Sequence, residues 1–157
     1  MKVAKKVKRK SPRLSPKQIQ TAVLKRLKKY GKLNFLEQYA MFMGVAQVLE
    51  ISLKQFAHSK YGIEFEKIER KTLGGIARLL RDKGLRPDFL SLLDDVVERR
   101  NYIAHDLLFS QFFLISVGAG NTRFERRILQ HAIYEVEQLY FLYEWTEKHK
   151  AWGSAVQ

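Results

Sequence analysis

The 157-residue chain contains no cysteine, and its four histidines are scattered. Without cysteine there can be no disulfide bond, no thiolate metal site and no cysteine nucleophile. This composition suits a reducing compartment, so we expect a cytoplasmic protein. Because the histidines do not have the spacing of metal ligands, the sequence predicts neither a bound metal nor a cofactor.

Long apolar runs are also missing. The longest apolar stretch, at residues 107–120, is interrupted by polar side chains and is too short to cross a bilayer. The basic N-terminus is not followed by the apolar segment of a signal peptide. We therefore expect neither a membrane span nor a membrane partner.

Acidic residues are absent from residues 1–32, which contain thirteen lysines and arginines. The rest of the chain contains sixteen residues of each sign, so the net charge of +13 resides in this N-terminal segment. Such a run is attracted to phosphate backbones, and the alternative is a solubilising tail or a targeting address. The basic residues expected to contact nucleic acid are Lys5, Lys6, Lys8, Arg9, Lys10, Arg13, Lys25, Arg26, Lys28 and Lys29.

Apolar residues recur at helical spacing along most of the chain, and no alternating strand pattern is found. The length and the 46% hydrophobic content predict one domain with a substantial core. We expect an all-α protein, an antiparallel helical bundle of about four to five helices. Its expected parts are a disordered basic tail over residues 1–14, a basic helix over 15–32, the bundle over 33–150 and a flexible C-terminus over 151–157.

Capping and turn residues predict where the first helices begin. Ser15, followed by a proline, is a helix-start signal. A second helix is expected over residues 34–61, where apolar side chains form the longest continuous stripe. The period changes near Thr72, so we expect a turn containing Gly74 and Gly75, and then a short helix that Thr72 caps.

The C-terminal half contains two further predicted helices. Pro87 opens the first, which we expect to end near residue 105. The stretch FFLISVGAGN, residues 112–121, is expected to be extended and then to form a flexible loop. A long final helix with a broad apolar face is expected from about Arg123 to Lys150.

The stretch ERRNYIAHDLL, residues 98–108, places Arg100, Asn101 and His105 in an otherwise apolar helical run. In an α-helix, residues four apart share a face, whereas residues five apart are rotated by about 140°. Asn101 and His105 can therefore stack on one face. Arg100 can join them only by extending its side chain, by a local loosening of the helix, or across an interface with a second copy of the chain.

An arginine and a histidine beside a basic segment suit one reaction that needs no metal, the attack of an RNA 2'-hydroxyl on the adjacent phosphorus. The histidine would exchange the proton, and the arginine would stabilise charge on the phosphoryl oxygens. Asn101 would orient either group. The substrate would be unpaired RNA. The alternative is that His105 caps carbonyl groups at the end of its helix.

The segment from Arg100 to His105 resembles the motif of the HEPN superfamily, in which an arginine and a polar residue, often asparagine, precede a histidine. The segment TLGGIARLLRDKG, residues 72–84, is similar to a short helix that many members place one helix before the motif. HDLLFSQFF, residues 105–113, resembles their apolar, aromatic-rich continuation. The resemblance covers residues 35–145 and leaves residues 1–32 outside.

The resemblance implies a HEPN-like bundle and a metal-independent endoribonuclease that forms a homodimer, with both motifs facing a shared cleft. His105 would be the acid or base, Arg100 the phosphate and transition-state group, and Asn101 the supporting polar group. Many relatives are toxins or phage-defence proteins, so an antitoxin protein is a further expected partner. Members that a partner nucleotidyltransferase modifies have a tyrosine two residues after the histidine, where this chain has Leu107.

Two other functions stay open at this point. Some members of the superfamily are non-catalytic, so the chain could dock RNA or DNA through residues 1–32 while the motif only packs. Alternatively, the apolar segment over residues 107–117 pairs with a partner chain, because such a segment is costly to leave exposed. Arg99 could line a phosphate-binding groove, although charges on helix faces are more often solvated surface.

Overall fold

The computed structural model describes residues 13–119 and 122–153. All regular elements within these ranges are helical, which confirms the all-α prediction. Residues 1–12 and 154–157, including the basic residues predicted to bind nucleic acid at positions 5–10, lie outside the described residues. The elements are α1 (Pro16–Leu27), the 3₁₀ turn η1 (Lys28–Tyr30), α2 (Phe35–Tyr61), the 3₁₀ turn η2 (Phe65–Lys67), α3 (Leu73–Asp82), α4 (Pro87–Tyr102), the π-helical turn η3 (Ile103–Leu107), α5 (Leu108–Ser116) and α6 (Arg123–His149).

Side-chain caps begin three helices where the sequence predicts a start. Ser15 and Asn34 each accept the backbone N–H three residues further on, and the side chain at that position returns a bond to the cap backbone. Thr72 caps α3 by accepting the Gly75 N–H. These bonds pair amides of the first turn that would otherwise lack a partner.

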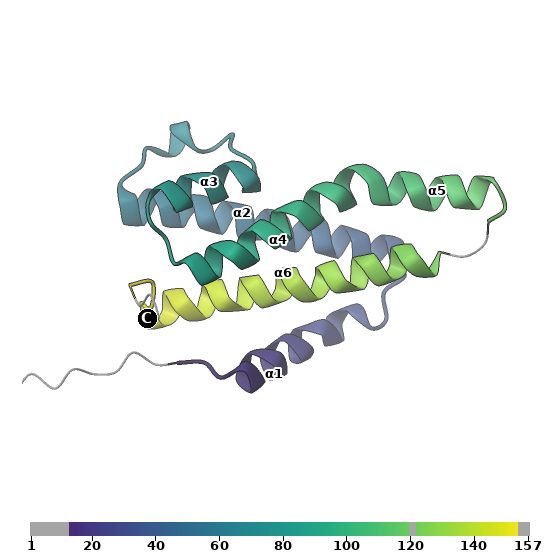
Figure 1. Cartoon of the computed structure of the whole chain (residues 1–157), viewed down its shortest axis with the longest axis horizontal. Helices are drawn as coiled ribbons and strands as arrows, with labels where there is room; N and C mark the ends of the chain where they lie inside the picture. Colours follow the sequence, from purple (N-terminus) through teal and green to yellow (C-terminus); the bar gives the residue numbers. More distant parts are fainter. Residues whose placement is uncertain (1–12, 120–121, 154–157) are drawn as a thin grey trace, which may run out of the picture.

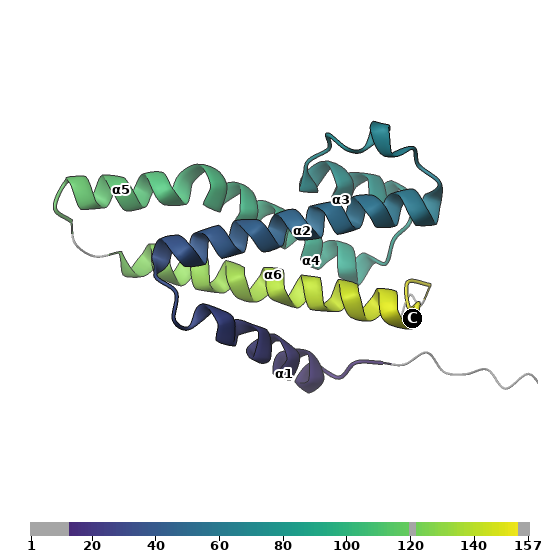
Figure 2. The same ribbon diagram turned by 180° about the vertical axis from the view of Figure 1, so that it is seen from behind.

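Helix α6 is the central element of the bundle. Helix α4 continues through η3 into α5 as one long rod, and α6 then runs back in the opposite direction (Figure 1). Helix α2 packs against α6, α3 packs on α2 and α4, and α1 lies along the other side of α6 (Figure 2). With α4 to α5 taken as one rod, the described residues form a bundle of five helical rods.

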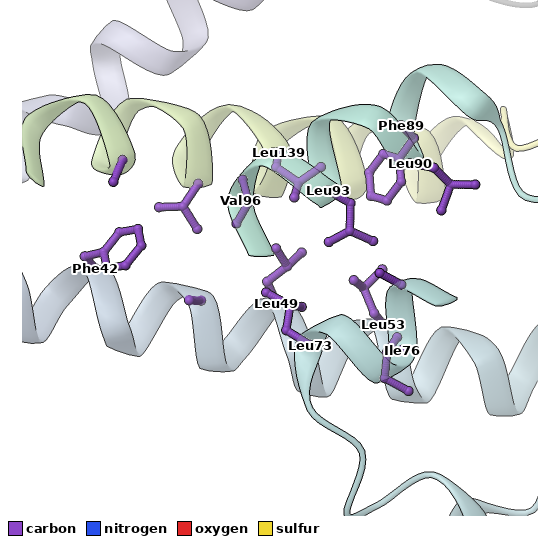
Figure 3. Close-up of a cluster of buried hydrophobic side chains, with 14 of the residues drawn as sticks. Phe42, Leu49, Leu53, Leu73, Ile76, Phe89, Leu90, Leu93, Val96 and Leu139 are labelled. Atoms are coloured by element: carbon purple, nitrogen blue, oxygen red, sulfur yellow. The ribbon is translucent and has the colours of Figure 1, made fainter. Parts of the chain in front are cut away.

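The hydrophobic core lies between α2, α3, α4 and α6 (Figure 3). Leu49 and Leu53 of α2 point toward Leu93 of α4 and Leu139 of α6. All four side chains are fully buried. Because burial of a leucine side chain contributes about 1.5–3 kcal/mol, this cluster holds the helices together.

Gly74 and Gly75 lie inside the first turn of α3. The predicted turn is therefore misplaced, because the chain turns before Thr72 and the two glycines are already helical. A β-carbon on Gly74 would come within 3.2 Å of Val97 Cγ1 on α4. The glycine thus permits close packing of α3 on α4, which accounts for its place in a helix.

The extended apolar end predicted at the start of residues 112–121 is wrong, because α5 stays helical to Ser116, and the expected departure from regular structure begins only at Val117. No glycine or proline lies between Leu108 and Val117, so nothing stops the helix before Gly118, whose φ is 71°. The helix that Pro87 opens, α4, ends at Tyr102, close to the expected end near residue 105, but the chain stays helical through η3 into α5.

The chain does not become a flexible tail directly after α6. Ala151 and Trp152 are buried, and the Trp152 ring packs on Phe56, Phe89 and Tyr143. The flexible C-terminus predicted from residue 151 is therefore wrong for these two residues. The indole adds a large apolar surface to the core between α2, α4 and α6.

A buried carboxylate on α6 fixes α1 in place. Glu137 is fully buried and accepts a hydrogen bond from the Tyr30 hydroxyl at 2.6 Å. Lys29 Nζ lies 2.6 Å from the same carboxylate, and Arg26 Nη1 lies 3.7 Å from it. Burial and the bond to Glu137 hold the pKa of Tyr30 well above its usual value. Because a buried carboxylate needs its partners, these contacts keep α1 docked on α6.

Candidate functional site

The helical rod loosens at the Arg–Asn–His constellation. Ile103–Leu107 form a π-helical turn, in which hydrogen bonds span five residues and not four. Each residue of such a turn rotates the chain by less than it does in an α-helix, so the angle between Arg100 and His105 falls below about 140°. The helix is therefore locally loosened between Arg100 and His105. This is one of the three ways in which their side chains could come together.

Apolar side chains hold the π turn against the bundle while its polar residues face solvent. Ile103 and Leu107 are fully buried. Asn101 and His105 are exposed, and Arg100 is half-buried. The core thus fixes the backbone of the turn and leaves the polar groups accessible.

Neither Arg100 nor His105 has a carboxylate partner among the described residues. Arg100 donates a hydrogen bond from Nη1 to Asn101 Oδ1 at 3.3 Å. Within residues 13–119 and 122–153, the side chain of His105 makes no hydrogen bond, ion pair or ring contact. The rod continues past His105, so there are no helix-end carbonyls at this point for the imidazole to cap. The structure therefore does not show His105 capping carbonyl groups at a helix end.

This arrangement can act on an anionic substrate. A guanidinium has five N–H donors, and the bond to Asn101 uses only one of them. The other donors can hold phosphoryl oxygens in a planar fork. An accessible imidazole one wide turn further along can accept or donate a proton as a general base or acid.

The cleft beside the constellation is unsuited to a phosphate. It has a volume of about 620 Å³, lies between α4 and α6, and is lined by the carboxylates Asp95, Glu98 and Glu135. Arg99 also lines it, but Arg99 Nε donates to Glu135 Oε2 at 3.2 Å, and His131 Nδ1 lies 3.1 Å from Glu135 Oε1. The phosphate role predicted for Arg99 does not fit this pairing.

The basic residues in and just before α1 and η1 fall into two groups. Arg26 and Lys29 pair with carboxylates of α6 and anchor α1, so they do not fit the predicted contacts with nucleic acid. Arg13, Lys25 and Lys28 are exposed, and no ion pair within the described ranges involves them. For these three positions, contact with nucleic acid stays a prediction.

One end of the molecule has its apolar side chains outward. Helix α5 buries only Gln111, whose Oε1 has no hydrogen-bond partner in the described part of the chain. Six large apolar side chains around α5 and the start of α6 each expose more than half of their surface, and we call them the α5 apolar surface. They are Phe109, Phe112, Phe113, Ile115, Val117 and Phe124.

Metal-ligand clusters of three or more residues are absent from residues 13–119 and 122–153. In the same ranges, no helix has the length and apolarity that a membrane crossing requires. Fold and site together define an all-α bundle with a solvent-facing Arg–Asn–His constellation at a π turn. Comparison with family models, curated proteins and solved structures found no match to the chain.

Proposed function

We propose that the protein is a metal-independent endoribonuclease that cleaves single-stranded RNA. The proposed catalytic residues are His105 and Arg100, with Asn101 as a supporting group. The observation that carries the proposal is the π turn, which rotates Arg100 and His105 toward one face of the helix. In addition, neither residue has a carboxylate partner among the described residues. The resemblance of the motif to the HEPN superfamily supports the same assignment and favours a toxin or phage-defence role.

In the proposed reaction, His105 takes the proton of an RNA 2'-hydroxyl while that oxygen attacks the adjacent phosphorus. The bond from phosphorus to the 5' oxygen breaks, and the leaving oxygen takes a proton from the imidazolium or from water. The products are a 2',3'-cyclic phosphate and a 5'-hydroxyl. Arg100 holds the phosphoryl oxygens, and Asn101 positions the guanidinium through the bond at 3.3 Å.

The proposed active form is a pair of chains joined through the α5 apolar surface. Helix α5 contains no charged residue, so the same surface on a second copy meets it without repulsion. The six exposed side chains offer on the order of 500 Å² per chain, and two copies would bury about 1,000 Å², the lower end of specific interfaces. The π turn directly precedes α5, so each site would lie beside this interface.

Cleavage of a labelled, partly single-stranded RNA in EDTA tests the proposal. Wild-type protein is expected to leave fragments with 2',3'-cyclic phosphate ends. His105→Ala is expected to lower the rate by about 100- to 10,000-fold, the usual contribution of a general acid or base. Arg100→Lys keeps the charge but loses the planar fork, so a smaller loss is expected.

Two controls make this experiment specific. His131→Ala removes another exposed histidine, which pairs with Glu135, and it is expected to leave cleavage unchanged. An RNA with a single 2'-deoxy position at the mapped site should resist cleavage there. Equal cleavage by wild type and His105→Ala would refute the assignment of His105.

The exposed lysines of α1 and η1 favour a second candidate function, nucleic-acid binding without cleavage. RNA that stays intact with wild-type protein while it is bound would support this candidate. In that case, deletion of residues 1–14, which contain seven basic residues, is expected to remove most of the affinity. The salt dependence of binding should also fall, because fewer counterions are released.

A further inference from the structure

An apolar groove on the outer face of α2 has no part in the proposed ribonuclease. Its volume is about 380 Å³, and it is open between α2, η1 and α6. Its lining includes Ala40, Met41, Gly44, Val48, Tyr140 and Lys29. Met41 and Val48 expose 36% and 47% of their surface, so this part of α2 is uncovered.

The groove continues along α2 as a stripe with the spacing of a helix-packing seam. Met41, Gly44, Val48 and Ile51 follow one another at intervals of three, four and three residues, which places them on one face. Ile51 is 46% exposed. A second helix could bury this stripe along almost three turns of α2.

Gly44 leaves room for a partner backbone to approach this stripe from outside. Glycine is among the least favourable residues inside a helix, and α2 is helical on both sides of Gly44. At Gly74, a β-carbon would meet Val97 at 3.2 Å, whereas a β-carbon on Gly44 would meet no atom within 4 Å. The packing of the chain itself therefore does not require glycine at position 44. A partner backbone seated in the groove would require it.

Positive charge borders the groove on the side of α1. Lys29 lines it, and Lys25 lies one helical turn earlier on the same face. The charge of Lys29 is offset by Glu137, but Lys25 is exposed and has no ion pair within residues 13–119 and 122–153. An occupant with acidic residues along this edge would complement the charge.

We propose that the α2 groove binds an amphipathic helix of a partner protein. The apolar face of that helix would cover Met41, Gly44 and Val48, and its acidic edge would face Lys25 and Lys29. The groove offers nucleic acid few polar side chains, and the basic N-terminal segment of the chain itself would be repelled by the lysines. The uncharged α5 of a second copy could fill the groove but would leave the lysines unpaired.

Selection from a displayed library of helix-forming peptides tests this proposal. The library fixes apolar residues at positions i, i+3, i+4 and i+7 and randomises the flanking positions. It is selected on the full-length protein and then depleted on Val48→Asp, which places a charge in the groove. The surviving peptides are expected to be enriched in Asp and Glu along one edge.

Direct binding of a selected peptide locates the site. Gly44→Leu fills the groove, and because leucine is the better helix former and the β-carbon has room, Tm should stay the same or rise. Peptide Kd should nevertheless increase at least about tenfold. Lys25→Glu should weaken binding of the acidic peptide and spare a peptide with lysines in place of its acids.

Phe65→Asp is the matched control, since it also places a charge on an exposed apolar side chain but lies in η2. It should leave peptide binding unchanged. The proposal is overturned if no peptide survives depletion, if survivors show no preference for acid, or if Gly44→Leu binds as tightly as wild type. Self-association that Val48→Asp abolishes, without peptide binding, would assign the groove to a second copy instead.

Discussion

Helices α4 and α5 are two parts of one rod, yet they place their apolar side chains in opposite ways. Helix α4 buries Phe89, Leu93 and Val96, whereas α5 buries Gln111 and exposes three phenylalanines. The difference lies in what surrounds them, because α2, α3 and α6 pack around α4, while α5 extends past α2 and α3 (Figures 1 and 2). Apolar composition therefore does not by itself identify a core; the neighbouring helices decide whether an apolar face is buried.

The π turn lies where the rod passes from its covered half to its uncovered half. Its buried residues, Ile103 and Leu107, are the last fully buried apolar side chains of the rod. The proposed catalytic residues thus sit at a boundary, fixed by the core on one side and next to the α5 apolar surface on the other. Three predictions probe the two halves separately.

The largest effect is expected from shortening a side chain in the covered half. Leu93→Ala leaves a cavity in the core and should lower the free energy of unfolding by about 2–5 kcal/mol. Phe112→Ala removes a larger side chain from the uncovered half, but should change the free energy by less than about 0.5 kcal/mol. Urea unfolding at low protein concentration measures both.

Equal losses from these two variants would end the distinction between the halves, because they would mean that the ring of Phe112 is already covered within one chain. The low concentration matters, since a dimer would make the stability of both proteins depend on association.

An intermediate effect is expected on self-association. Phe112→Asp adds a charge to the centre of the α5 apolar surface and should raise the Kd of the dimer at least about 100-fold, which corresponds to about 2.7 kcal/mol. Light scattering over a concentration series measures this change. Phe65→Asp is the control, because Phe65 is also exposed but lies in η2. A wild-type chain that stays monomeric at high concentration would contradict the proposed pairing.

The smallest effect is a dependence of stability on alkaline pH, and it should arise in the bundle because α5 has no ionisable side chain. Burial raises the pKa of Tyr143 on α6 to about 12. Since the folded pKa lies above the usual value, the contribution to stability is complete below pH 10 and is lost as pH rises toward 12. Tyr143→Phe should flatten this loss.

Urea midpoints at pH 9 and pH 11 measure the alkaline effect of Tyr143→Phe. Part of the loss should remain in the variant, because burial also raises the pKa of Tyr30, Tyr61 and Tyr140. Tyr102→Phe, at an exposed position in α4, serves as the control. A difference between the two midpoints that Tyr143→Phe leaves unchanged would contradict the prediction.

Local signals in the sequence predicted much of the fold. The starts of α1 and α3 followed from Ser15 and Thr72, because a cap bond joins residues only three apart, and the start of α2 followed from its apolar stripe. The extended conformation predicted for the last residues of α5 was wrong, because a continuous apolar run does not distinguish a helix from a strand. The burial of Trp152 was also missed, because its ring partners lie on α2, α4 and α6.

The candidate site was predicted only in part. The five-residue spacing of Arg100 and His105 raised the question of a loosened helix, but no local signal chose that route over the other two. The acidic cleft was missed, although Asp95, Glu98 and Tyr102 have the three- and four-residue spacing of one helix face. The third carboxylate of the cleft, Glu135, comes from α6. Arg99 forms an ion pair with it, and this ion pair joins α4 to α6.

The sequence by itself determined the helical class, the caps, the separate basic segment and the constellation of Arg100, Asn101 and His105, because each depends on residues close together in the chain. Only the tertiary structure decided which charges are paired and which apolar faces are covered. The bond between Tyr30 and Glu137 joins residues 107 positions apart, and α5 is uncovered because no other α-helix of the described residues packs closely along it. Such contacts depend on how whole helices pack, since local spacing sets a face but not its neighbour.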